Sequence, residues 1–429
     1  MSTAQLSPKA PNRRFAIAAI ASAMLFSSVQ AAPSLFSEPE ARAGTAKAGT
    51  LETYNVEVAT TALTANSATI SIALPGMPPF EATRSIFNDA GSNATWRGRS
   101  AEGHDVLLTI SGEKVRGRIY TGGASYGIAP DNAGGHTLSR LDPAALPSDR
   151  VTVPEIPYAL VPEPKSVVTT SDSAQATVDV MVVFAAEVGA TIPDQAGLNL
   201  FAQAAIDQTN LVLENSQVDS FRVRLVKAAR VTRSGSGNPD VDLSPVRQDP
   251  QIAAMRAAAG ADVVVFVGNY TQGFSGAAYK NTRPVQYGPV FAGFAYAIVD
   301  RAGVENSLVF VHELGHVLGM DHDVLSPHDP PADNSFPFAY GHISPRQAPY
   351  ARGVLTVMAY QGSCGGNEAC QQVPYFSNSN IAPPQAPFEG RAIGVLDQGE
   401  NYRVAAIVGP ITADFMTAED ILVSSFEEP

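Results

Sequence analysis

Three of the seven histidines of this chain lie within eleven residues, in the stretch His312–His322, which reads HELGHVLGMDH. On a helix, residues four apart are separated by about 40° around the axis. His312 and His316 can therefore direct both imidazoles at one zinc ion, at about 2.1 Å. Glu313 can take the proton of a water molecule on that ion as the water attacks a carbonyl group, and pass it to a leaving amine. The spacing predicts a metal site that carries its own general base.

His322 cannot reach the same ion from a straight helix, because ten residues of helix rise about 15 Å. Gly319 lies where the helix must end, and glycine adopts the left-handed conformation of a helix terminus at little cost. The pattern HExxHxxGxxH thus predicts three ligands and a fourth position for water, which is typical of catalytic zinc. The alternative is a set of surface histidines on a helix whose apolar face packs inward through Leu308, Val311, Leu314 and Leu318.

The elements that position these residues are indicated by hydrophobic patterning after residue 175. The expected strands are Val178–Phe184, Phe221–Ala229, Ala261–Val267 and Ala295–Val299, and the expected helices are Pro193–Ser216 and Pro250–Ala259. Near-continuous apolar runs are typical of strands that are covered on both faces. The order β-α-β-α-β predicts an α/β (α+β) fold with a twisted, mostly parallel sheet and helices on its faces, one of which carries the histidines.

Composition divides the rest of the chain. Residues 51–147 alternate apolar and polar side chains between turns, which predicts a small β-rich domain. Five prolines between 147 and 164 predict an extended, protease-accessible linker. The expected organisation is a signal peptide at 1–31, a β-rich region at 32–147, a Pro/Ser/Thr-rich linker at 148–174, an α/β domain at 175–416 and a C-terminal tail at 417–429.

The N-terminus is typical of an export signal. A basic start is followed by the apolar run 15–25 and a small-residue cleavage site before Ala32. An uncleaved anchor is the alternative, although the run is too short to span a bilayer. We expect a secreted protein, periplasmic in transit, without stable membrane insertion after signal removal. The net charge of −13 and the lack of a basic run disfavour nucleic acid as a partner.

Two further groups of residues could bind or crosslink. Cys364 and Cys370 have five residues between them, a spacing that excludes a CxxC metal knuckle. In an oxidising compartment a small disulfide loop is expected, with free thiols as the alternative. Asp240 and Asp242 could bind Ca2+, but a solvated acidic loop is the favoured interpretation, so calcium is unsupported.

The long histidine motif resembles that of the metzincin zinc metallopeptidases. HELGHVLGMDHD is most similar to the reprolysin branch, which also follows the third histidine with aspartate, here Asp323. The resemblance implies that Met358, in TVMAY, forms the Met-turn beneath the zinc histidines. Tyr360 departs from the reprolysin pattern and is similar to the tyrosine of astacins and serralysins. That similarity implies an oxyanion-stabilising role near zinc, with simple packing as the alternative.

The resemblance also implies where substrate binds and how the enzyme is held latent. Gly276, Ala277 and Ala278 correspond to an edge strand that pairs with extended substrate, and Tyr375 and Phe376 to a segment lining the S1′ pocket. The peptidyl-Asp metalloendopeptidase group is a plausible neighbour among bacterial relatives. The β-rich region would be a propeptide, cleaved in the linker. No cysteine precedes Cys364, which excludes latency through a propeptide cysteine and leaves a carboxylate or steric cover.

The sequence therefore predicts a secreted zinc metalloendopeptidase, made as a zymogen. It would hydrolyse protein or peptide substrates as a monomer by attack of a zinc-bound water, with Glu313 as general base. The alternative is a catalytically inactive metzincin-like module for binding or adhesion. Such inactive copies commonly lose the glutamate, which is present in this chain.

Overall fold

The structure is a computed structural model that describes residues 32–42, 48–131, 133–142, 149–154, 175–271, 274–326, 335–346, 352–364 and 370–416. The expected signal peptide, most of the expected linker and the C-terminal tail lie outside these residues. Within them, no helix combines the length and the apolar character needed to cross a bilayer.

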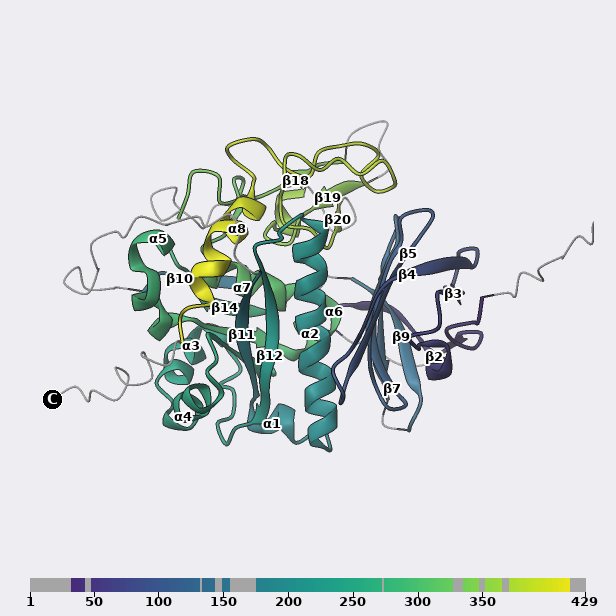
Figure 1. The fold of residues 1–429 in the computed structure, drawn as a ribbon, viewed down its shortest axis with the longest axis horizontal. Helices are drawn as coiled ribbons and strands as arrows, with labels where there is room; N and C mark the ends of the chain where they lie inside the picture. Colours follow the sequence, from purple (N-terminus) through teal and green to yellow (C-terminus); the bar gives the residue numbers. More distant parts are fainter. Residues whose placement is uncertain are drawn as a thin grey trace, which may run out of the picture. The chain divides into compact units, whose positions relative to one another are not determined.

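A large antiparallel sheet forms the N-terminal region, as the alternating pattern predicted (Figure 1). Its strands are β1 (Glu40–Ala41), β2 (Thr50–Val56), β3 (Thr69–Ile72), β4 (Phe80–Asp89), β5 (Ala94–Ser100), β6 (Asp105–Ser111), β7 (Lys114–Tyr120), β8 (Ser125–Pro130) and β9 (His136–Leu141). They are ordered β1-β2-β9-β8-β7-β6-β5-β4-β3. Alternate side chains, including the fully buried Trp96, form a core separate from that of the following domain.

The second sheet carries the candidate site. Its strands are β10 (Asp149–Thr152), β11 (Ala176–Phe184), β12 (Phe221–Arg230), β13 (Val263–Gly268), β14 (Gly276–Tyr279) and β15 (Tyr296–Asp300), in the order β10-β14-β15-β13-β11-β12. Neighbouring strands are parallel except β14, which is antiparallel to β15. The expected mostly parallel sheet in a mixed α/β fold is therefore confirmed.

Helices cover this sheet. They are α1 (Ala186–Gly189), α2 (Gln195–Asn215), α3 (Pro239–Arg247), α4 (Pro250–Ala259), α5 (Pro284–Tyr287), α6 (Arg301–Asn306), α7 (Val309–Val317) and α8 (Asn401–Thr412). Asp194 caps α2 by accepting from the Gly197 N–H, and α4 ends at the left-handed Gly260. Figure 1 shows α2 on one side of β11 and β12 and α8 on the other.

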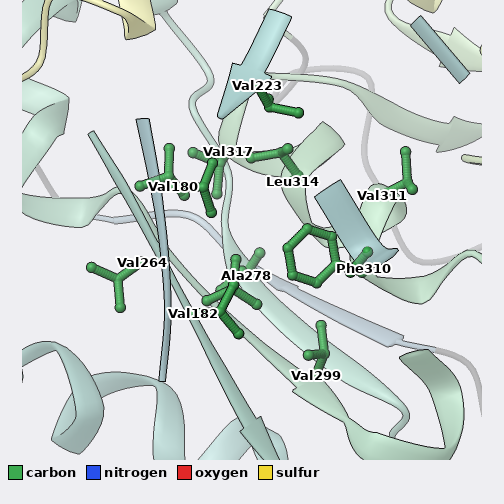
Figure 2. Close-up of a cluster of buried hydrophobic side chains, with 14 of the residues drawn as sticks. Val180, Val182, Val223, Val264, Ala278, Val299, Phe310, Val311, Leu314 and Val317 are labelled. Carbon is green, nitrogen blue, oxygen red and sulfur yellow. The ribbon is translucent and has the colours of Figure 1, made fainter. Parts of the chain in front are cut away.

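The apolar residues of α7 fix it on the sheet. Phe310, Leu314 and Val317 are almost fully buried, and Figure 2 shows them among sheet residues such as Val180 and Ala278. Burial of each large apolar side chain contributes about 1.5–3 kcal/mol. This packing fixes the histidine helix against β14 and β15.

The expected linker differs from the structure at its start. Residues 149–152 were expected to be extended and accessible, but they form β10, and Asp149 is buried. β14 would otherwise leave one row of main-chain groups unpaired, and an adjacent extended segment satisfies them. The first residues after the N-terminal sheet therefore enter the second sheet.

The remaining elements form small sheets after the histidine stretch. They are β16 (Asp321–Asp323) with β17 (Tyr340–Gly341), and β18 (Ile343–Ser344), β19 (Gly353–Leu355) and β20 (Cys370–Gln372). A disulfide joins Cys364 to Cys370, whose Cα atoms are 6.1 Å apart. The free-thiol alternative is thus not what the structure contains.

Candidate active site

The end of α7 turns the chain back toward its own histidines. Gly319 has a φ of +89°, the left-handed region. The Gly319 N–H donates to the His316 carbonyl at 2.8 Å and the Met320 N–H to the Gly315 carbonyl at 2.9 Å, the bond pair of a Schellman helix terminus. His322 follows in β16 and reaches the same point in space as the two helical histidines.

The three imidazoles converge through their Nε2 atoms. The Nε2 of His316 lies 3.1 Å from that of His312 and 3.0 Å from that of His322. Nδ1 of His312 lies 2.8 Å from the Val357 carbonyl, and Nδ1 of His316 lies 2.9 Å from the Met320 carbonyl. A carbonyl only accepts, so Nδ1 of His312 and Nδ1 of His316 carry the proton, and in the neutral ring Nε2 keeps its lone pair. Burial also lowers the pKa of His316 to about 4.

Lone pairs that face one another at this distance repel unless a cation lies between them. Neutral imidazoles whose other nitrogen donates to a carbonyl are the usual zinc ligands. The donor set therefore fits a metal ion, with His312, His316 and His322 as ligands. In the described part of the chain, these histidines and Asp149 are the group that could hold one.

The carboxylate of Asp149 lies among the three imidazole nitrogens. Its Oδ2 lies 3.1 Å from Nε2 of both His312 and His316, and 3.0 Å from Nε2 of His322. Burial opposes ionisation of this carboxyl, but the charges and hydrogen bonds of the histidines outweigh it and hold its pKa well below the usual range. The position expected for water is thus filled by a carboxylate from β10.

Glu313 is completely buried, and neither carboxylate oxygen has a hydrogen-bond partner among the described residues. Burial, followed by the nearby negative charge of Asp149, raises the pKa of Glu313 well above its usual range. The side chain lies against Gly276 of β14, where any Cβ would overlap its Oε1. Glu313 is therefore held beside the ligand cluster by β14.

Met358 packs against the histidine helix. It is fully buried, and a Cβ added to Gly315 would lie only 2.5 Å from its Sδ. The preceding residue, Val357, supplies the carbonyl that orients His312. The turn both supports the helix and fixes one ligand ring.

Tyr360 reaches the cluster. Its hydroxyl lies 2.6 Å from Nε2 of His322 and 3.5 Å from the Asp149 carbonyl oxygen. Asp323 holds the tyrosine in place, since its Oδ2 accepts the Tyr360 N–H at 3.0 Å. The phenol is thus near enough to the ligand nitrogens to interact with a group bound there.

The expected substrate-binding residues divide into two groups. Gly276, Ala277 and Ala278 lie on β14, but β10 pairs with their outer edge. Tyr375 packs on Phe388 with ring centroids 5.3 Å apart, and Phe376 is buried in the main core. The segment touches the site through its backbone, because the Tyr375 carbonyl accepts the Val357 N–H at 2.9 Å.

The suggested calcium residues have protein partners. Asp242 accepts from the Ser236 N–H at 2.7 Å and from the Tyr270 hydroxyl at 3.1 Å. Asp240 forms an ion pair with Arg150 at 3.3 Å. Asp242 is buried rather than part of a solvated loop, and both carboxylates have a structural explanation.

Sequence reasoning missed Asp149. It is an isolated acidic residue in a proline-rich segment, 163 positions before His312. No local pattern marks it. The only available signal was the absence of a propeptide cysteine, which left a carboxylate as one way to cover the site.

Of the comparisons with known proteins, the match to a family model agrees with this geometry. Residues 201–323 match the family model described as metallo-peptidase family M12B, reprolysin-like. A comparison with curated proteins found no match. The solved structure of a chaperone–substrate complex is 18% identical in sequence, with a TM-score of 0.43. The match covers 82% of this chain and 48% of that chain, so this chain spans about half the length of that protein. The crystal structure of metalloproteinase-II from Bacteroides fragilis is 11% identical with a TM-score of 0.40, and the match covers 61% of this chain and 83% of that one. The family match, which ends just past the three converging histidines, supports a reprolysin-like metzincin metallopeptidase in this part of the chain.

Proposed function

We propose that the protein is a secreted, zinc-dependent endopeptidase with a metzincin catalytic domain, made as a latent precursor. The observation that carries the proposal is the convergence of three imidazole Nε2 atoms beside a buried glutamate whose oxygens have no hydrogen-bond partner among the described residues. A structural zinc site has no use for such a carboxylate, whereas a hydrolase needs a base beside the metal.

Each residue has a role that follows from its position. His312, His316 and His322 would hold the ion, which supplies Lewis acidity toward a peptide carbonyl and toward water. Glu313 takes a proton from the attacking water and returns it to the leaving amine. Tyr360 donates a hydrogen bond to the oxygen on which negative charge develops.

We further propose that Asp149 keeps the precursor inactive. A carboxylate among the three ligand nitrogens completes a four-ligand set and leaves no position for water. The same strand pairs with β14 along the edge that extended substrates would use. One segment therefore excludes both the water and the peptide.

The β-rich region would hold this segment in place through contacts with α2. The hydroxyls of Thr95 and Thr109 donate to the buried carboxylate of Asp207, at 2.7 and 2.6 Å. The Arg97 guanidinium donates to the Asn215 side chain at 2.8 Å. Charge-assisted hydrogen bonds of this kind are the stronger ones in proteins, so the region would be a propeptide that covers the cleft until the chain is cut.

The test is peptide hydrolysis by the processed protein. We expect o-phenanthroline to abolish cleavage of casein and added zinc to restore it. Glu313→Gln should keep its zinc and lose activity by about 10²–10⁴-fold, the usual contribution of a general base. Glu389→Gln, which removes the same charge from a surface loop, is the matched control. Zinc binding without cleavage of any of a varied set of peptides would instead favour the binding module.

A further inference from the structure

A second buried charged pair lies next to the ligand cluster and takes no part in the proposed reaction. Lys280, directly after β14, and Asp321, directly before His322, form an ion pair. Their side chains are 1% and 0% exposed. Taking two charges out of water costs free energy that their attraction repays only with good geometry, so such a pair is weak evidence of stabilisation alone. The pair lies directly beside the third histidine, so a role in positioning that histidine has to be considered.

The residues around this pair connect β14 to the turn that brings the third histidine to the site. The Asn281 N–H donates to the His316 carbonyl at 3.2 Å. The Asn281 carbonyl lies so close to Gly319 that a Cβ there would be 2.6 Å from its oxygen. Residues 280 and 281 thus contact the chain at the second ligand, at the hinge and at the residue before the third ligand.

His322 needs such support more than the other two ligands. His312 and His316 are fixed by the helix and by its packing on the sheet. His322 lies instead in the three-residue strand β16, which comes after the left-handed Gly319. Its neighbour Asp321 is held on one side by its N–H, which donates to the Ala339 carbonyl at 2.8 Å. Lys280 holds the side chain of Asp321 from the other side.

We propose that Lys280 and Asp321 are positioning residues, which fix His322 in the place where it can bind zinc together with His312 and His316. The pair acts through His322 and touches neither the metal nor the substrate. The inference rests on the proposed zinc site. It adds that β14 is linked to the ligand framework, because Lys280 continues directly from β14 and pairs with Asp321.

The test replaces both charges with apolar groups of similar size, in the full chain. Lys280→Met/Asp321→Leu should fold, because exchanging a buried ion pair for apolar residues is often neutral or stabilising. We expect its zinc dissociation constant, measured by chelator competition, to rise by about 10–100-fold, the usual effect of losing a group that orients a ligand. The visible spectrum of the cobalt-substituted protein should change as well, since it reports ligand geometry.

Asp321→Asn provides a second variant, which keeps the shape of the side chain and one hydrogen-bond acceptor for Lys280. The zinc dissociation constant of this variant should rise less than that of the double variant. Arg233→Met removes the ion pair with Asp249 elsewhere in the domain and should leave zinc affinity unchanged. Folded variants with wild-type zinc affinity and an unchanged cobalt spectrum would overturn the inference. If the wild-type chain bound no zinc, the proposed function itself would fail, so the two failures are distinguishable.

Discussion

Removal of the Asp149 carboxylate should release part of the activity of the uncut chain. Its Oδ2 lies 3.0–3.1 Å from the three ligand nitrogens, in a site with almost no solvent exposure. Truncating one partner of a buried, hydrogen-bonded charge pair costs about 2–5 kcal/mol. Each 1.4 kcal/mol is a factor of ten, so Asp149→Ala should raise the rate of the intact precursor by about 30- to 4,000-fold.

The rate should stay below that of the processed enzyme, because the main chain of β10 still pairs with β14. The assay measures the initial hydrolysis of a short fluorogenic peptide, with chain length checked on gels and zinc content measured on the same samples. Arg150→Ala is the control. It lies on the same strand, and its exposed ion pair with Asp240 contributes about 0–1 kcal/mol at most. An Asp149→Ala precursor that is intact, zinc-loaded and as inactive as the wild type would refute the reasoning.

Three further changes test other contacts. Gly276→Ala should push the Glu313 carboxylate aside and reduce kcat at least about tenfold without changing zinc content, as measured by steady-state kinetics and metal analysis. Thr109→Val removes a donor to the buried Asp207 and should lower the unfolding free energy of the full chain by about 1.5–3 kcal/mol in urea titrations. Burial raises the pKa of Asp262 to about 7, so its contribution to stability is complete below about pH 4 and is lost as the pH rises through 7. The wild type should therefore lose about 2–3 kcal/mol relative to Asp262→Asn between about pH 5 and pH 8.

Each of these has a contrary outcome. Gly293 has open space around it, so Gly293→Ala controls for the added methyl group. Equal kcat values for Gly276→Ala and Gly293→Ala would show that the close contact between Gly276 and Glu313 does not matter for catalysis. A Thr109→Val chain as stable as the wild type would mean that the α2 contact does not hold the β-rich region. Parallel pH curves for the wild type and Asp262→Asn would show that this carboxyl titrates normally.

Local sequence patterns predicted the individual strands and the end of the histidine helix, because these features depend on residues that are close together in the sequence. The apolar runs at 178–184 and 261–267 became β11 and β13, because continuous burial leaves a continuous apolar pattern. Gly319 indicated the helix end, because only a left-handed residue could turn the chain toward a third ligand. The partners of these elements in the sheets were not predictable, since strand order depends on contacts between distant segments.

The ligands could be predicted because they lie close together in the sequence, whereas the residues around them come from distant segments. His312, His316 and His322 share one short motif, but Asp149 and Lys280 reach the site from other elements, 163 positions before His312 and 41 before Asp321. Neither has a composition or spacing that marks it. The prediction of an accessible linker was wrong at its start, because Asp149 is buried and Asp149–Thr152 form a strand of the second sheet. A proline-rich composition does not reveal that β14 has main-chain groups left to pair.

The most direct test of the account is the X-ray absorption spectrum at the zinc edge of the Glu313→Gln full chain, which should not cleave itself. The account predicts one zinc ion per chain with three histidine nitrogens and one carboxylate oxygen at about 2.0–2.1 Å. Asp149→Ala in the same background should exchange that carboxylate for water while the three nitrogens remain. A zinc ion without histidine ligands, or a full chain that binds no zinc, would contradict the central claim.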